Sequence, residues 1–265
     1  MRRGRARSEL AETAHATVDA SLCILEMPPV TDPAIAVFDA YGTLFNVHSA
    51  VARLADRMGP DAERISELWR QKQLEYTWTR SLMGRYVDFW QVTEEALDYV
   101  LAVFDRREVS LQSQLLNAYR ELDAYPDVRA ALRGYREQGF RVAVFSNANR
   151  SILTTLLTAA GLRDLVDTVQ SVHESQVFKP DVRVYAAAAK AFNVAPASIH
   201  FHSSNGWDAA GAASCGWQSL WINRTARPQE YPWIHVPAVA DLGEALLHNT
   251  AAADGANKGD NIPAA

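Results

Sequence analysis

Short apolar runs that stop at polar residues mark the expected strands of this chain. Residues 35–38 form one such run, which ends at Asp39, and residues 140–145 form a second one. Short continuous apolar runs are typical of strands that are buried on both faces of a parallel sheet. The first run therefore predicts a buried strand that places Asp39 at its carboxyl end.

The pattern changes between residues 47 and 121, where no strand-like run occurs. Apolar residues instead recur three and four positions apart, which is the period of an amphipathic helix. The clearest examples are Ile65, Leu68, Trp69 and Leu74, followed by Phe89, Val92, Ala96, Leu97 and Val100. These positions predict a helical segment that is inserted after the first strand.

After Pro126 the expected strands and helices alternate. The expected helices cover residues 128–138, 151–160, 182–192 and 207–215, and the expected strands cover residues 140–145, 166–169, 199–201 and 219–222. Such alternation is typical of βαβ units, which build a parallel sheet. We therefore expect an α/β fold: a Rossmann-like parallel-sheet core of residues 34–47 and 122–249, with an inserted helical cap of residues 48–121.

The two ends of the chain lack these patterns. Residues 1–33 begin with an Arg-rich stretch and end in a turn-prone, Pro-rich stretch, and we expect them to form a flexible leader. Acidic residues interrupt the apolar core that a secretory signal would need. An organelle transit peptide and a misassigned start, with the true start at Met27, both remain open. Residues 250–265 are rich in Ala, Gly, Asn and Asp and are expected to form a disordered tail.

Composition narrows the class of protein further. The chain has 265 residues, 48% of them hydrophobic, and a formal net charge of −5. An acidic chain offers no obvious basic surface for nucleic acid, so no nucleic-acid partner is expected. Its apolar stretches are far shorter than the roughly 20 residues that cross a bilayer, and Cys23 and Cys215 form neither a disulfide framework nor a zinc motif. We expect a cytoplasmic protein that does not bind a membrane.

Four polar clusters follow expected strands. They comprise residues 39–43, 146–147, 179–180 and 203–208. Each cluster taken singly also fits a turn or a helix cap. In a doubly wound sheet, however, ligands bind beyond the carboxyl ends of the strands, so four clusters in such loops favour one shared site.

In order, these clusters resemble the four motifs of the haloacid-dehalogenase superfamily, in which a strand-end aspartate is a covalent nucleophile. The resemblance covers about residues 34–247. Most members of that superfamily transfer phosphoryl groups with an Asp-x-Asp motif and magnesium, whereas here Tyr41 stands two positions after Asp39. A tyrosine side chain, with a pKa near 10, is a poor general acid at neutral pH, which disfavours phosphatase chemistry.

Longer segments resemble the L-2-haloacid dehalogenases of type II. The matching strings are residues 38–45, 69–78, 81–86 and 203–208. Two of them lie in the expected cap, where members of the superfamily differ most. The resemblance implies an (S)-2-haloacid dehalogenase that converts short 2-haloalkanoates to (R)-2-hydroxyacids and halide with inversion, through an aspartyl ester, and without a metal or another cofactor.

The first step of such a reaction requires several kinds of side chain. Displacement of halide from the carbon beside a carboxylate needs a nucleophile, which Asp39 supplies. Because nucleophile and substrate are both anionic, a cation is required nearby, and Lys179 is the candidate. The hydroxyl of Ser146 and backbone N–H groups of residues 39–42 are expected to bind the substrate carboxylate. Arg70 from the cap, with Asn147, is expected to receive the halide.

The resemblance also implies the remaining site residues. Asp208 is expected to be the base that activates water against the ester. The residues expected to orient water, Asp208 and Lys179 are Thr43, Tyr185, Ser203 and Asn205. The residues expected to form a mainly apolar wall, with the glutamine at its edge, are Tyr41, Gln71, Leu74, Phe89 and Trp207.

Two other functions stay open at this point. A magnesium-dependent phosphatase of the same superfamily would use the same nucleophile, and a protein that binds small carboxylates without turnover would use the same pocket. The joint presence of Asp39, Lys179 and Asp208 favours catalysis over binding. The family further implies a homodimer.

A few positions depart from the family pattern without removing a proposed catalytic group. They are Ala148, Val182 and His202. His202 is expected either to be a strand-end histidine with satisfied hydrogen bonds or to tune Asp208 or Lys179. His48 and His173 have no partner that the sequence identifies.

Overall fold

The structure, a computed structural model, describes residues 34–249. Its centre is a six-stranded sheet in the order β3-β2-β1-β4-β5-β6, in which all neighbouring strands are parallel. The strands are β1 (Ile35–Phe38), β2 (Arg141–Ser146), β3 (Thr168–Ser171), β4 (Ile199–Ser203), β5 (Gln218–Ile222) and β6 (Ala238–Val239). The predicted α/β fold with a parallel sheet is confirmed. The predictions for residues 1–33 and 250–265 lie outside the described residues.

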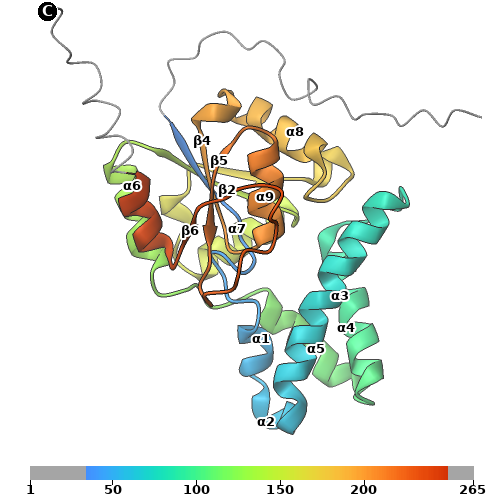
Figure 1. Cartoon of the computed structure of the whole chain (residues 1–265). Helices are drawn as coiled ribbons and strands as arrows, with labels where there is room; N and C mark the ends of the chain where they lie inside the picture. The colour runs from blue at the N-terminus through green and yellow to red at the C-terminus, as the bar shows by residue number, and fades with distance from the viewer. Residues whose placement is uncertain (1–33, 250–265) are drawn as a thin grey trace, which may run out of the picture.

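Helices cover both faces of the sheet. They are α6 (Val128–Glu137), α7 (Arg150–Ala159), α8 (Val182–Phe192) and α9 (Gly206–Ser214). Helix α6 and a further helical stretch, residues 242–249, lie on one side of the sheet, and α8 and α9 lie on the other (Figure 1). Parallel neighbours require crossover connections, and these helices provide them while shielding the apolar strands from water.

Strand β1 lies at the centre of the core because β2 and β4 flank it. All four of its residues are buried, and Phe38 pairs in register with Val144 of β2 and His202 of β4. The apolar composition of the strand follows from this position, since neither face meets solvent. The next residue, Asp39, therefore emerges between the carboxyl ends of two neighbouring strands.

Between β1 and α6 the chain forms five helices, here called the helical segment (residues 49–119). They are α1 (Ser49–Ala52), α2 (Ala55–Met58), α3 (Ala62–Leu82), α4 (Phe89–Val103) and α5 (Val109–Tyr119). The segment extends away from the sheet core (Figure 1). Helices α3 and α4 pack against each other, which explains the apolar residues at helical spacing in both.

The helical segment is attached to the core at two places. The chain enters and leaves it through adjacent stretches of backbone, where the Asn46 N–H donates to the Asp123 carbonyl over 2.8 Å. At a second place, the Phe178 N–H donates to the Ser81 hydroxyl over 3.1 Å. The segment is thus attached where the chain enters and leaves it and at the C-terminal end of α3, and Arg70 in the middle of α3 contacts core residues.

Some element boundaries differ from the expectation. Strand β3 begins two residues later than expected, and the edge strand β6 and the helical residues 242–249 were not expected at all. Strand β6 has only two residues, which is too short to produce a recognisable pattern. None of the helices within residues 34–249 combines the length and the apolar composition that a membrane span requires.

Candidate active site

Asp39 lies directly after β1, at the carboxyl edge of the sheet, and is 5% exposed. Its Oδ2 accepts hydrogen bonds from Asn205 Nδ2 at 2.8 Å and from the Thr43 hydroxyl at 3.1 Å. Its Oδ1 is 3.3 Å from Lys179 Nζ. The loop turns sharply at Gly42, whose φ of 93° is disfavoured for residues with a side chain. One carboxylate oxygen is therefore fixed by two donors, and the other keeps lone pairs for chemistry.

Lys179 places a buried ammonium between two carboxylates. Its Nζ donates to Asp208 Oδ2 at 2.8 Å, to Asp39 Oδ1 at 3.3 Å and to the Phe145 carbonyl at 2.8 Å. The side chain is 1% exposed, and the Nζ also lies 4.2 Å from the centre of the Phe145 ring. The three donors of the ammonium are thus all used, and the positive charge is held beside Asp39 in an environment that screens it little.

Asp208 lies in the first turn of α9 and is fully buried. Its Oδ1 accepts from the Tyr185 hydroxyl at 2.7 Å, and its Oδ2 accepts from Lys179 and from the Ser203 hydroxyl at 3.2 Å. Burial raises the pKa of Asp208 to about 6; the charge of Asp39 also raises it, whereas Lys179 and Tyr185 lower it. Such a carboxyl group exchanges a proton readily near neutral pH, as a general base must.

The carboxyl end of β2 and the loop after it bring Ser146 and Asn147 to the same edge. Both are buried, and Asn147 Oδ1 accepts from the backbone N–H of Lys179 at 3.0 Å. Asn147 thereby links the end of β2 to the loop that carries Lys179. The Ser146 hydroxyl oxygen accepts from the Ala148 N–H at 3.3 Å, which leaves its proton for another acceptor.

Two of the backbone groups that we expected to bind a carboxylate are already engaged. The Asp39 N–H donates to the His202 carbonyl at 3.0 Å, and the Gly42 N–H donates to the Phe45 carbonyl at 2.7 Å. The expectation is therefore wrong for these two groups, because the Asp39 N–H joins the end of β1 to β4 and the Gly42 N–H maintains the turn after β1.

Arg70 reaches the site from α3 of the helical segment. Its Nη2 donates to the Tyr41 carbonyl at 3.2 Å and to Asn205 Oδ1 at 3.1 Å, and its Nη1 donates to Gln73 Oε1 at 2.7 Å. Within residues 34–249 it forms no ion pair with a carboxylate. The guanidinium therefore keeps its full positive charge beside the loop that carries the nucleophile.

Aromatic side chains of the core contact aromatic side chains of the helical segment beside the site. The Tyr41 ring contacts the Phe89 ring, with centroids 5.4 Å apart, and both residues are buried. Trp207 of α9 meets Trp78 of α3 edge to face at 5.6 Å. Burial raises the pKa of Tyr41 well above its ordinary value, so its hydroxyl is unsuited to the acid role that the second carboxylate plays in phosphatases.

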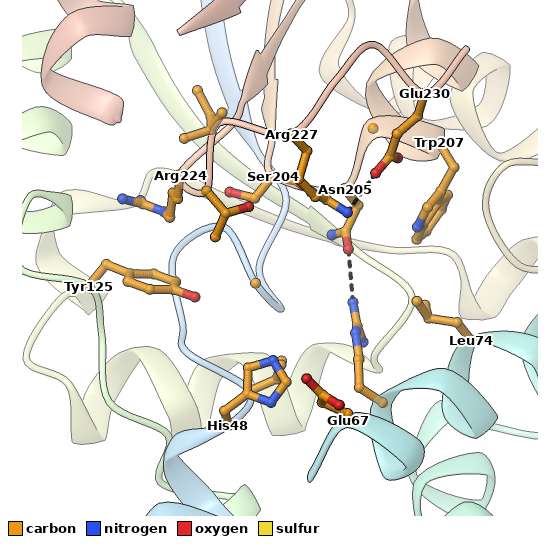
Figure 2. Close-up of a pocket in the computed structure, with 16 residues that line it drawn as sticks. His48, Glu67, Leu74, Tyr125, Ser204, Asn205, Trp207, Arg224, Arg227 and Glu230 are labelled. Atoms are coloured by element: carbon orange, nitrogen blue, oxygen red, sulfur yellow. Dashed lines mark hydrogen bonds and ion pairs between the residues drawn. The ribbon is translucent and has the colours of Figure 1, made fainter. Parts of the chain in front are cut away.

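A cavity of about 530 Å³ opens between α3, the Asp39 loop and the loop after β5. Arg70, Leu74, Asn205 and Trp207 are among the residues that line it. Figure 2 shows the Asn205 side chain pointing across the cavity toward α3, where it meets the arginine, with Leu74 and Trp207 to one side. The cavity thus leads from the surface to the arginine and the nucleophile loop.

The expected site residues thus mostly converge, with one clear exception. Gln71 is exposed, and no hydrogen bond of its side chain is found in the part of the chain that the structure describes. Gln73, which we did not expect in the site, is buried and bonds Arg70 instead. Side chains three positions apart share a helix face, so the spacing from Arg70 could have indicated it.

The histidines have partners outside the catalytic cluster. His202 is fully buried, stacks on Phe38 at 4.6 Å, and its Nε2 lies 2.7 Å from the Tyr135 hydroxyl. It is thus a satisfied strand-end histidine, and its ring contacts neither Asp208 nor Lys179. His48 and His173 pair with hydroxyl groups of the helical segment, at 2.8 Å and 3.0 Å respectively.

Comparisons with known proteins agree with this geometry. The family model of the haloacid dehalogenase-like hydrolases matches residues 33–216. The chain is 46% identical to (S)-2-haloacid dehalogenase 1 of Pseudomonas sp. (strain CBS-3), across 81% of this chain and 96% of the relative. It is 44% identical to (S)-2-haloacid dehalogenase 4A of Burkholderia cepacia, across 80% and 94% of the two chains.

Solved structures give the same result. A dehalogenase crystal structure with 43% sequence identity superposes with a TM-score of 0.79, covering 83% of this chain and 98% of the other. The L-2-haloacid dehalogenase from Xanthobacter autotrophicus with chloropropionic acid covalently bound is 34% identical, with a TM-score of 0.74 and coverage of 83% and 99%. The chain therefore belongs to the haloacid dehalogenase-like hydrolases and, within them, to the (S)-2-haloacid dehalogenase family.

Proposed function

We propose that the protein hydrolyses short (S)-2-haloalkanoates to (R)-2-hydroxyacids and halide through an ester of Asp39. One observation carries this proposal: Arg70, a cation without a carboxylate partner among the described residues, faces the loop that carries a buried and oriented aspartate. A leaving anion can be received there. The covalent chloropropionic acid complex of the Xanthobacter relative supports a covalent route.

In the first step, Asp39 Oδ1 attacks the substrate carbon that carries the halogen. The C–O bond of an ester forms as the carbon–halogen bond breaks, and the halide leaves with the bonding electron pair. Attack comes from the side opposite the halogen, so the configuration at this carbon inverts. The choice of Oδ1 follows from the hydrogen bonds, because Oδ2 is held by Asn205 and Thr43.

Two groups offset the repulsion between nucleophile and substrate. The Lys179 ammonium, bonded to both Asp39 and Asp208, reduces the negative charge that the anionic substrate meets. The Ser146 hydroxyl donates to the substrate carboxylate. Both groups are already oriented toward the negative charges of Asp39 and the substrate, so they stabilise these charges without the reorganisation that water would need.

The departing halide is received by Arg70 and by the amide N–H₂ of Asn147. Asn147 directs its oxygen to the Lys179 backbone, which leaves its amide hydrogens for an anion. The negative charge on the halogen grows as the bond lengthens, so these contacts strengthen toward the transition state and accelerate the step.

In the second step, water attacks the carbonyl carbon of the Asp39 ester while Asp208 accepts its proton. The bond between the Asp39 carbonyl carbon and Oδ1 breaks, Asp208 returns its proton to the leaving oxygen, and the hydroxyacid departs. The Asp39 carboxyl group, which now holds one oxygen from water, releases the remaining water proton to solvent and is restored as a carboxylate. The inverted carbon is not touched, so the product keeps the R configuration. Ser203 and Tyr185 hold Asp208, and Thr43 and Asn205 hold the Asp39 carboxyl group.

The same proposal assigns roles to the two parts of the fold. Residues 34–47 and 122–249 act as the catalytic core, and residues 48–121 act as a cap. The cap supplies Arg70 for the halide and also Leu74 and Phe89, which together with Tyr41 and Trp207 line the substrate's alkyl side and exclude water. We further propose that the enzyme works in the cytoplasm as a homodimer.

A direct assay tests the proposed function. Halide release would be measured from S- and R-2-chloropropionate in EDTA, beside phosphate release from small phosphoesters with magnesium. Chloride from the S substrate alone, with R-lactate as the product, is the expected result. Magnesium-dependent phosphate release without chloride would replace the proposal by a phosphatase, and binding of 2-chloropropionate without turnover would replace it by a carboxylate-binding protein.

A further inference from the structure

Within residues 34–249, the hydrogen-bond partners of the Arg70 guanidinium are neutral oxygen atoms, and the Tyr119 hydroxyl also lies beside it. The partners with a measured geometry are the Gln73 side-chain amide, the Tyr41 carbonyl and the Asn205 side-chain amide. The shortest, at 2.7 Å, is the bond to Gln73, which lies one helical turn further along α3. Gln73 is the residue whose contribution the proposed mechanism leaves open.

Gln73 is 1% exposed and all its polar atoms have partners. Its Oε1 accepts from Arg70 Nη1 and from the Tyr119 hydroxyl at 3.1 Å, and its Nε2 donates to the Thr93 hydroxyl at 2.7 Å. Thr93 in turn donates its hydroxyl proton to the Phe89 carbonyl at 2.8 Å, so its oxygen can only accept from Gln73. The amide therefore has one allowed orientation, with its oxygen toward Arg70.

We infer that Gln73 is a positioning residue for halide departure: it holds Arg70 in place while leaving its positive charge available. The inference rests on the proposed function, in which Arg70 receives the halide. A neutral amide accepts a hydrogen bond from a guanidinium without forming an ion pair. Gln73 thus fixes the orientation of the Arg70 side chain without neutralising its positive charge.

Other side chains at this position would fail in different ways. A glutamate would pair with Arg70 and compete with the halide for its charge. A methionine of similar size would leave the Tyr119 hydroxyl and one guanidinium nitrogen without their acceptor in a buried site. Because Tyr119 stacks on Tyr41 at 5.6 Å with an interplanar angle of 11°, the same network also supports the apolar wall.

The test uses single-turnover halide release from S-2-chloropropionate and S-2-bromopropionate. Chloride is the poorer leaving group and depends more on stabilisation of its developing charge. We expect Gln73→Met to slow chloride release about tenfold or more, the loss that follows removal of a hydrogen bond to a charged group, and to slow bromide release less. The ratio of the bromide rate to the chloride rate should therefore rise. The matched control, Gln91→Met on the exposed face of α4, should leave both rates unchanged.

A second variant separates the effect of the position of Arg70 from the effect of its charge. Gln73→Glu keeps the size and the acceptor, and Arg70 stays anchored. We expect it to weaken product inhibition by chloride and bromide about tenfold or more, because the carboxylate neutralises the guanidinium. This measurement stays informative if Gln73→Met does not fold.

A double-mutant cycle tests whether Gln73 affects halide release through Arg70. In an Arg70→Met background, Gln73→Met should add less than about a twofold further loss, since its target is gone. The inference is overturned if Gln73→Met slows both halides equally, or if it costs the same factor with and without Arg70. Wild-type enzyme that releases no halide from either substrate would instead contradict the proposed function, whatever the variants do.

Discussion

The Tyr185 hydroxyl donates a 2.7 Å hydrogen bond to Asp208 Oδ1, and both side chains are fully buried. This bond favours the ionised form of Asp208, whereas burial raises its pKa to about 6. The balance between the two sets the pH below which the proposed base is protonated and inactive.

Tyr185→Phe should therefore shift the acid limb of ester hydrolysis to higher pH. A lost hydrogen bond to a charged group of about 1.5 kcal/mol corresponds to a shift of roughly 1 pH unit. The rate of the second step, measured against pH after rapid ester formation, checks this. Tyr99→Phe on α4 serves as the control and should leave the profile in place. An acid limb that moves to lower pH in Tyr185→Phe would argue against Asp208 as the base.

Lys179→Met should destabilise the fold more strongly at pH 8 than at pH 5. The substitution leaves two buried carboxylates without their cation, which costs about 3 to 5 kcal/mol when both are ionised. Without Lys179 the pKa of folded Asp208 rises further above its unfolded value, so the fold is less affected at low pH and loses stability as the pH rises. Urea unfolding at both pH values measures the difference, with Lys190→Met on α8 as control. An equal loss at both pH values would contradict this account.

Asn205→Asp should lower the rate of ester formation by about a hundredfold. Asn205 stands at the cap position of α9, yet its side chain makes no cap bond and donates to Asp39 instead. A carboxylate there repels the nucleophile, while the helix itself tolerates either residue as a cap. The control is Asn149→Asp, because Asn149 does cap α7 and a carboxylate preserves that bond. Equal activity of both variants would refute the role given to Asn205.

His202 should make the fold sensitive to acid. Burial lowers its pKa to about 3, so unfolding below its ordinary pKa takes up a proton. The contribution of His202 to stability should be complete above about pH 6.5 and fall by about 1.4 kcal/mol per pH unit below it. Urea midpoints of wild type and His202→Gln between pH 4.5 and 7 test this, because Asp208 and the other titrating groups act in both proteins and the stability difference between them should shrink by that amount as the pH falls. His235→Gln, an exposed control, should keep the wild-type slope.

The sequence predicted the features that depend on the pattern of apolar and polar residues. Strand β1 and helix α8 start and end where their apolar residues predict, because a buried strand and an amphipathic helix are read directly from burial periodicity. The positions of Asp39, Lys179 and Asp208 at the carboxyl edge of the sheet followed from the same alternation, since parallel strands bring their carboxyl ends to one edge. The contacts among these side chains could not be predicted without distances.

Other features depend on tertiary contacts that no local pattern reveals. Asn205 has the position and residue type of a helix cap, and only the packing of the Asp39 loop against α9 directs it elsewhere. Gln71 and Gln73 are chemically identical, and the rotation of α3 against the core decides which one is buried beside Arg70. Strand β6 owes its existence to pairing with β5 rather than to its own two residues.

The central claim, a covalent ester of Asp39, is tested most directly by a single turnover in H₂¹⁸O with enzyme in excess over S-2-chloropropionate. Water is proposed to attack the ester carbonyl, so ¹⁸O should appear in the Asp39 carboxylate, and mass spectrometry of the peptide that contains it should show the heavier mass. The R-lactate formed should then carry only ¹⁶O at its hydroxyl. Lactate labelled in the first turnover, with an unlabelled Asp39 peptide, would mean that water displaces the halide directly and would contradict the account.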